Sequence, residues 1–233
     1  MSNNQISEHD GREGERFAPL ERSSLSQRAY EEVRRYLMRG RLKPGERLVS
    51  RTLASELGIS TTPVREALFR LASEQALVLD HRNTVMVPDL TRRQYQEIRD
   101  IRMELEGMAA ERAAQEAAPA DIDRLARLQH RHLEAQDADN LEEALALNEE
   151  FHFALCRLSR LPVLVRMIEG LWLQCGPTLN HFYAGRTQVW ARAEHPHFKA
   201  IACLRDRDGA GARAAMAADI DQGARPILAA LKA

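Results

Sequence analysis

The chain has 233 residues, of which 44% are hydrophobic and only 5% aromatic, and its formal net charge is −1. This size can supply the core of one large domain or two modest ones, and the composition favours helices over sheets. A net charge close to zero excludes a uniformly basic protein that coats DNA. The charge is unevenly distributed, however. Residues 22–90 carry 12 Lys and Arg against 8 Asp and Glu, which leaves this segment at +4 and the rest of the chain at −5.

The first 22 residues are polar and charged, without hydrophobic periodicity, and predict a flexible arm. They lack the apolar segment of a signal peptide, and no run in the chain approaches the roughly 20 apolar residues of a membrane span. We therefore expect a soluble, cytoplasmic protein without membrane contact. The three cysteines, Cys156, Cys175 and Cys203, are odd in number and widely spaced, which favours reduced thiols over a disulfide framework or a zinc knuckle.

Three amphipathic helical patterns follow the arm. The first is expected to begin at a Ser26 cap and to end at Gly40, and the second to begin at a Ser50 cap and to end at Gly58. The third begins at Ser60, so two short helices flank a glycine-containing turn. That arrangement is typical of a helix-turn-helix.

A change of period follows the third helix. Residues 76–80 (ALVLD) and 85–88 (VMVP) read as short strands, and the polar residues between them form the tip of a β-hairpin. A hairpin after three helices is the wing of a winged helix-turn-helix. We assign residues 23–89 to this domain.

Residues 90–233 show no further strand pattern. Thr91 and Gln94 form a capping box that predicts a long helix to about residue 116, and Pro119 begins the next. Further helical patterns cover residues 140–158, 162–183, 188–206 and 209–231, with Pro177 and Pro226 as ends or kinks. The fold class is therefore mainly α, a winged helix-turn-helix followed by an all-helical bundle for effector binding and dimerisation.

The second helix of a helix-turn-helix enters the major groove with its first residues on base edges. A helix N-terminus with short hydroxyls suits phosphate oxygens, and an arginine one turn later can reach guanine O6 and N7. Side chains at the wing tip can enter the minor groove. The predicted DNA-binding residues are Arg51, Ser60, Thr61, Thr62, Arg65, His81 and Arg82.

The segment ERLVSRTLASELGISTTPVREALFRLASEQAL resembles the GntR family of bacterial regulators, whose usual core is close to VSRTPVREAL. The resemblance is continuous over about 30 residues and implies that Arg51, Thr62 and Arg65 contact DNA. One position departs from the pattern. Thr61 stands where the family commonly has an arginine that contacts a base, which implies an altered operator preference.

The helical part resembles the FadR-like branch of this family, whose FCD bundle often holds a divalent metal through an Asp-x-x-x-His pair and two later histidines. The pair falls on Asn148 and His152, whose i, i+4 spacing places both on one helix face. The third ligand falls on His197, with His195 as the alternative. The fourth, usually histidine, falls on Asp219.

Two interpretations of this set stay open. The four residues hold one divalent ion, or they line a metal-free pocket that binds the effector directly. Arg102 matches an arginine that many FCD domains carry on their first long helix and could pair with the carboxylate of an organic acid; an ion pair with Glu106 is the alternative. The effector-binding candidates are Arg102, Asn148, His152, Gln174, Asn180, His197 and Asp219.

We therefore expect a homodimeric regulator that binds a palindromic operator in double-stranded DNA and responds to a small-molecule effector, with repression as the family's usual mode. The first alternative is a metal-dependent enzyme using His152 and His197. The chain has no HExxH, nucleophile elbow or glycine-rich phosphate loop, so we expect no enzyme activity. The second alternative is an interaction protein that has lost DNA binding.

Overall fold

The computed structural model describes residues 25–181 and 195–231. The predicted arm, residues 1–22, and the first part of the helix predicted at 188–206 lie outside these ranges. The N-terminal domain consists of α1 (Leu25–Met38), α2 (Ser50–Leu57), α3 (Thr61–Ser73), β1 (Val78–Leu79) and β2 (Val85–Met86). The two strands pair antiparallel, as predicted for the wing.

Two predicted helix caps, Ser26 and Ser50, are wrong. The described part of α1 begins at Leu25, so Ser26 lies in its first turn, and Ser50 is the first residue of α2 with Val49 in the cap position. Gly58 ends α2 in the left-handed conformation with φ of 66°, as expected. Glycine adopts this conformation without the steric cost that a Cβ imposes.

The C-terminal domain contains α4 (Arg92–Glu116), α5 (Pro119–Asp137), α6 (Leu141–Leu158), α7 (Pro162–Cys175), the short 3₁₀ helix η1 (Gly176–Leu179), α9 (Pro196–Arg205) and α10 (Gly209–Ala230). The capping box of Thr91 and Gln94 is present. The helix predicted at 162–183 ends as an α-helix at Cys175 and continues as the 3₁₀ helix η1, because Pro177 has no N–H to donate and its ring obstructs the carbonyl four residues earlier; residues 182–183 lie outside the described ranges. Pro226, in contrast, lies inside α10.

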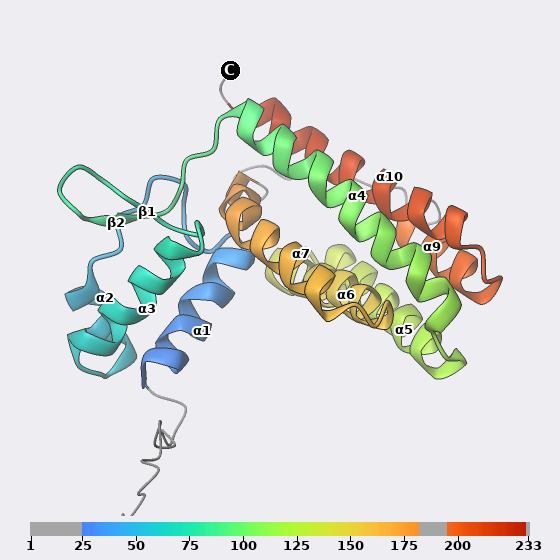
Figure 1. The fold of residues 1–233 in the computed structure, drawn as a ribbon, viewed down its shortest axis with the longest axis horizontal. Helices are drawn as coiled ribbons and strands as arrows, with labels where there is room; N and C mark the ends of the chain where they lie inside the picture. The colour runs from blue at the N-terminus through green and yellow to red at the C-terminus, as the bar shows by residue number, and fades with distance from the viewer. Residues whose placement is uncertain (1–24, 182–194, 232–233) are drawn as a thin grey trace, which may run out of the picture.

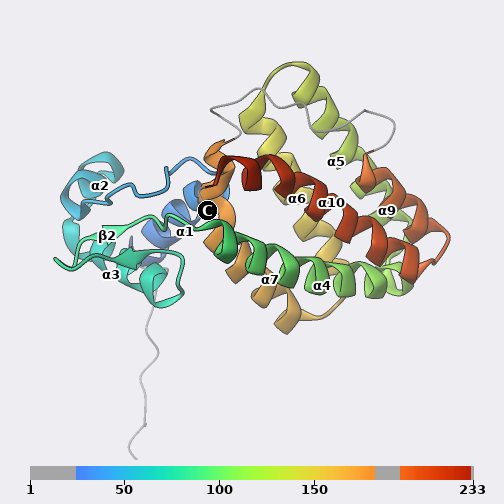
Figure 2. The ribbon, with the colours of Figure 1, turned by 90° about the horizontal axis from the view of Figure 1, so that it is seen from above.

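The two domains share part of their core. Leu37 and Leu68 of the N-terminal domain belong to the same buried cluster as Phe153, Ile168 and Trp172 of the bundle. Full burial of such a side chain contributes about 1.5–3 kcal/mol. Figures 1 and 2 show α2, α3 and the wing at one end of the molecule, with α1 between them and α7. The helix-turn-helix and the wing thus project from one end of the bundle. The shared core, which we call the joint between the domains, packs them against it.

Within the described ranges, no helix combines the length and apolar content that crossing a bilayer requires.

Candidate DNA-reading surface and buried histidine centre

The N-terminus of α3 is open to solvent. Ser60 occupies its cap position without a side-chain hydrogen bond to the helix, and Ser60, Thr61, Thr62 and Arg65 are all exposed. The unpaired N–H groups of the first turn and these hydroxyls are the donors that a phosphate oxygen or a base edge can use. On the opposite side Val64, Ala67, Leu68 and Leu71 are buried. This burial fixes which face of α3 points outward.

Three arginines around this surface have no counter-ion in the part of the chain that the structure describes. Among the described residues, no carboxylate lies within ion-pair distance of Arg51, Arg65 or Arg82, and all three are exposed. Arg70, near the end of α3, differs because its guanidinium pairs with Glu74 at 3.1 Å and lies over the Tyr30 ring. Arg51, Arg65 and Arg82 therefore keep their donors for an external anion.

The wing tip is held by one aspartate. The Asp80 carboxylate accepts backbone N–H groups of Arg82 and Thr84 at 2.8 and 2.9 Å, and Asn83 adopts a left-handed φ of 57°. This turn leaves His81 and Arg82 exposed beyond the strands. The sequence prediction for the wing side chains is consistent with this placement.

A buried centre lies inside the bundle, where α6, α9 and α10 supply His152, His197 and Asp219. His152 Nε2 lies 3.0 Å from Asp219 Oδ2 and 3.3 Å from His197 Nε2, and His197 Nε2 lies 3.4 Å from the same oxygen. A tetrahedral ion with bonds of about 2.0–2.1 Å separates its ligand atoms by about 3.3 Å. The three atoms therefore form one face of a coordination shell.

Two outer residues orient the histidines. His152 Nδ1 lies 2.7 Å from Glu106 Oε2, and His197 Nδ1 lies 2.6 Å from Gln129 Oε1. Because both acceptors hold the proton on Nδ1, both Nε2 atoms can present a lone pair to the centre, as in the carboxylate–histidine–metal arrangement. Glu106 and Gln129 are fully buried. The donor set and its outer partners fit a divalent ion.

The charges of the centre are compatible with this assignment. Burial opposes a charge on His152, but the neighbouring Asp219 and Glu106 outweigh it and raise its pKa to about 9. Burial likewise opposes ionisation of Asp219, yet His197 and His152 hold the pKa of this carboxyl well below its usual range. Without a metal, a proton on His152 therefore balances the carboxylates.

The structure brings together three of the four predicted ligands. Asn148 lies one turn before His152, half-buried, and its amide forms no hydrogen bond with any described residue. His195, the predicted alternative to His197, is also buried, with Nδ1 3.8 Å from Asp219 Oδ1. Burial together with the neighbouring His197 lowers the pKa of His195 to about 3. His197 and His195 thus both lie at the centre.

The remaining effector candidates lie elsewhere. Arg102 donates to Glu106 at 2.7 Å and stacks on Trp172, which is the ion pair expected as the alternative to an effector contact. Asn180 donates to the carbonyl of Gly40 at 3.1 Å, and so belongs to the joint between the domains. Gln174 is half-buried on α7.

Sequence reasoning missed Gln129 and His132, and it named Glu106 only as a partner of Arg102 and not as the residue that orients His152. Gln129 and His132 occupy the buried stripe of α5 between Leu125 and Leu133, so a polar residue on an apolar face was the available signal. His132 is buried with its ring centre 5.5 Å from that of His195, and its Nδ1 lies 2.8 Å from the Ala144 carbonyl oxygen.

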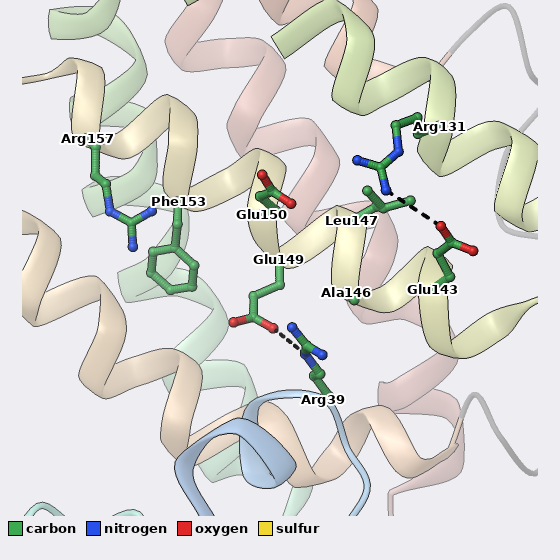
Figure 3. A pocket seen from close by; sticks show the side chains of 9 residues that line it. All are labelled: Arg39, Arg131, Glu143, Ala146, Leu147, Glu149, Glu150, Phe153 and Arg157. Carbon is green, nitrogen blue, oxygen red and sulfur yellow. Dashed lines mark hydrogen bonds and ion pairs between the residues drawn. The ribbon is translucent and has the colours of Figure 1, made fainter. Parts of the chain in front are cut away.

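The joint between the domains is built on close backbone contact. A Cβ on Gly176 would lie 2.4 Å from the Leu37 carbonyl oxygen, so only glycine permits α1 to pack this closely on η1. Beside the joint, Figure 3 shows a pocket of about 290 Å³ where Arg39 at the end of α1 points toward Glu149 of α6. Their ion pair measures 3.2 Å.

Comparison with known proteins identifies both halves. Residues 25–87 match the bacterial regulatory proteins of the gntR family, and residues 97–222 match the FCD domain. This chain belongs to the GntR family. The HTH-type transcriptional regulator McbR of Escherichia coli K12 is 36% identical over 200 residues, which cover 85% of this chain and 90% of McbR. This GntR chain is thus a DNA-binding transcriptional regulator with an FCD domain.

Solved structures of bacterial regulators have the same fold as this chain. That of E. coli McbR/YncC superposes with a TM-score of 0.81 at 34% identity, covering 88% of this chain and 98% of the other. A GntR regulator from Rhodococcus sp. RHA1 gives 0.72 at 18% identity, covering 89% and 99%, a likeness of fold alone. The gluconate operon transcriptional repressor of Bacillus subtilis is 27% identical over 185 residues, 78% of this chain and 73% of the repressor. The predicted fold class and family are confirmed.

Proposed function

We propose that this regulator binds a palindromic operator as a homodimer, with α3 in the major groove and the wing in the minor groove. We further propose that a ligand bound at the buried centre changes the affinity of the regulator for DNA. The observation that carries the proposal is a set of exposed arginines around the open N-terminus of α3 that have no counter-ion within residues 25–181 and 195–231, namely Arg51, Arg65 and Arg82. One short helix reads few base pairs, and a two-fold dimer doubles the sequence read.

The ligand of the centre is proposed to be a divalent ion held by His152, His197 and Asp219, with His195 beside them. Three protein ligands leave positions that the carboxylate of a small organic acid can occupy. One relative is named for a gluconate operon and is a repressor, which supports an organic acid as effector and repression as the mode. The bound ion would supply a fixed positive charge for that carboxylate.

A metal-free centre is the second candidate, because His152 lies between two carboxylates and its raised pKa favours a cationic imidazolium at neutral pH. In that case the protonated His152 itself would attract the carboxylate. Glu106 and Asp219 already surround this cation, however. We therefore favour the ion.

The DNA-binding part is tested by mobility shift on the upstream DNA. Arg65→Ala is expected to weaken operator binding by about 5- to 150-fold, the equivalent of the roughly 1–3 kcal/mol that a good contact with a base contributes. Arg124→Ala removes an equally exposed arginine from α5 of the bundle and should leave binding unchanged. If Arg65→Ala binds as well as the wild-type protein, α3 is not the reading helix.

The metal part is tested by isothermal titration of chelator-treated protein with Zn²⁺, Ni²⁺ and Mn²⁺. One ion per chain is expected, and Asp219→Asn, which keeps the shape but removes the charge, should weaken binding at least tenfold. His130→Ala removes an exposed histidine outside the centre and serves as the control. Absence of stoichiometric binding, combined with direct binding of an organic acid, would favour the metal-free centre.

A further inference from the structure

Gln129 of α5 holds His197 through one end of its amide and leaves the other end unpaired. Its Oε1 lies 2.6 Å from His197 Nδ1, while its buried Nε2 has no hydrogen-bond partner among the described residues. Phe151 stacks on the His197 ring with 3.7 Å between the ring centres, which fixes the ring edge that faces Gln129. A buried amide donor without a partner is unfavourable. Hydrogen bonding to His197 therefore does not by itself explain why an amide stands here.

Glu106 shows what a carboxylate does in the equivalent position. Its Oε2 lies 2.7 Å from His152 Nδ1, and its Oε1 accepts from the Trp172 indole. Glutamate has nearly the same size as glutamine, so a carboxylate at position 129 would also accept the proton of His197 Nδ1. It would bring no donor that needs a partner. The property that the amide of Gln129 changes is the charge of the centre.

The charges that surround the centre are few. Glu106 is balanced by Arg102, whose Nε lies 2.7 Å from its Oε1. Asp219 is the carboxylate that lies beside both histidines of the ligand set. With a divalent ion bound, Asp219 balances one of its two positive charges, and the loaded centre keeps a net charge of +1. A buried charge without a counter-charge is unfavourable, so the loaded centre attracts one anion.

Two neighbouring imidazoles leave this charge unchanged. The backbone N–H of His197 donates to His195 Nδ1 at 3.3 Å. The side-chain amide nitrogen of Gln136 lies 3.0 Å from His132 Nε2 and donates to it. A ring nitrogen that accepts a hydrogen bond carries no proton, so the rings of His195 and His132 are both neutral.

We propose that Gln129 selects the effector by keeping the loaded centre positive, and that the effector presents a single carboxylate to it. The inference rests on the ion of the proposed function and assigns a role to a side chain outside the ligand set. The amide then has two separable effects. Its oxygen orients His197 and supports metal affinity, whereas its lack of charge supports affinity for the carboxylate.

Two substitutions separate these effects. Gln129→Leu removes the acceptor without adding charge, so the affinity for Zn²⁺ should fall about 10- to 100-fold, while acetate binding to the loaded protein should stay within about threefold of wild type. Gln129→Glu keeps the acceptor and adds a negative charge. Its affinity for Zn²⁺ should be retained or rise, while its affinity for acetate should fall by about tenfold or more, because the attraction of the unbalanced charge is lost.

The measurements use the full chain. Isothermal titration of chelator-treated protein gives the affinity for Zn²⁺, and the visible absorption of protein saturated with Co²⁺ follows the binding of sodium acetate. Acetamide has nearly the shape of acetate without its charge and should bind at least about tenfold more weakly. Gln115→Glu adds the same charge at an exposed position of α4 and serves as the control. Circular dichroism of each variant verifies that the helices are intact.

The outcomes separate this inference from the proposed function. Wild-type protein that binds no ion would overturn the metal centre and this inference with it. A loaded wild-type protein that binds no acetate, or binds acetamide equally well, would overturn the inference alone. The same holds if Gln129→Glu leaves acetate binding unchanged or if Gln129→Leu weakens it equally. Loss of Zn²⁺ affinity in the leucine variant and of acetate affinity in the glutamate variant supports the assignment.

Discussion

Substitution of Gly176 by alanine tests the joint between the DNA-reading domain and the bundle. The added Cβ would lie 2.4 Å from the Leu37 carbonyl oxygen and 2.8 Å from the Met38 Cα. Side-chain Cβ atoms keep at least 3.0 Å from such atoms, so α1 must move by about 0.6 Å. Both contacts are backbone, and no change of rotamer can relieve them.

Overpacking of this kind costs about 1–3 kcal/mol. In a chain of 233 residues that loss lowers Tm by roughly 2–12 °C. Scanning calorimetry measures the shift, with Gly223→Ala as the matched control. Gly223 lies inside α10, where a Cβ would meet nothing within 4 Å, so alanine there should stabilise the helix by about 0.5–1 kcal/mol. A Gly176→Ala protein that melts at or above the wild-type temperature would refute the close packing of α1 on η1.

Three further changes probe the same region. Glu106→Gln leaves Arg102 buried without its counter-ion and should cost about 3–5 kcal/mol in urea unfolding at pH 7. Burial would raise the pKa of Glu106, but Arg102 and His152 lower it to about 2. The ionised Glu106 therefore contributes its full stability above about pH 4.3, and this contribution is lost as the pH falls toward 2. In the variant the free energy of unfolding should depend less on pH between these two values. Arg39→Ala removes the partner of the half-buried Glu149 and should lower the unfolding free energy by about 1 kcal/mol, while an unchanged value would show that the pair does not support the joint. Trp172→Phe keeps an aromatic side chain but replaces the indole and so removes the N–H donated to Glu106 at 3.0 Å. In this variant we expect metal to change operator affinity, measured by fluorescence anisotropy, by less than threefold. An undiminished response to metal would exclude this contact as the coupling element.

The fold was largely predictable from local chemistry. Gly58, Pro119 and the pair of Thr91 with Gln94 each specify a helix end through backbone geometry or hydrogen bonds within a few residues, and each is found where expected. Ser50 misled because serine is as compatible with the first turn as with the cap, and only packing of the preceding loop decides between them.

The centre was only partly predictable, because its ligand candidates and their outer partners come from five helices, α4, α5, α6, α9 and α10. The resemblance placed His152, His197 and Asp219, and they do meet. It did not identify Glu106, which lies 46 residues from His152 in the chain yet 2.7 Å from it in space. No local pattern shows that a carboxylate with an arginine one turn earlier also orients a distant histidine. The ion pair of Arg102 and Glu106, expected as the alternative to an effector contact, is present, but its link to the centre depends on the third partner, His152.

Glu106 gives the two halves of the regulator a physical connection. One of its carboxylate oxygens holds His152 at the centre, and the other accepts from Trp172 of α7. Three residues after the indole, α7 ends at Cys175, and the next residue, Gly176, lies against the backbone of α1. An ion bound by His152 and Asp219 would therefore act on a residue, Glu106, that also holds α7, and α7 packs against α1, on which α3 packs. Coupling between two binding sites is reciprocal, so if the ion changes operator affinity by some factor, operator DNA must change metal affinity by the same factor. Metal titrations with and without operator thus measure the same coupling from its other side, and an identical metal affinity in both would mean that the centre is not coupled to DNA binding.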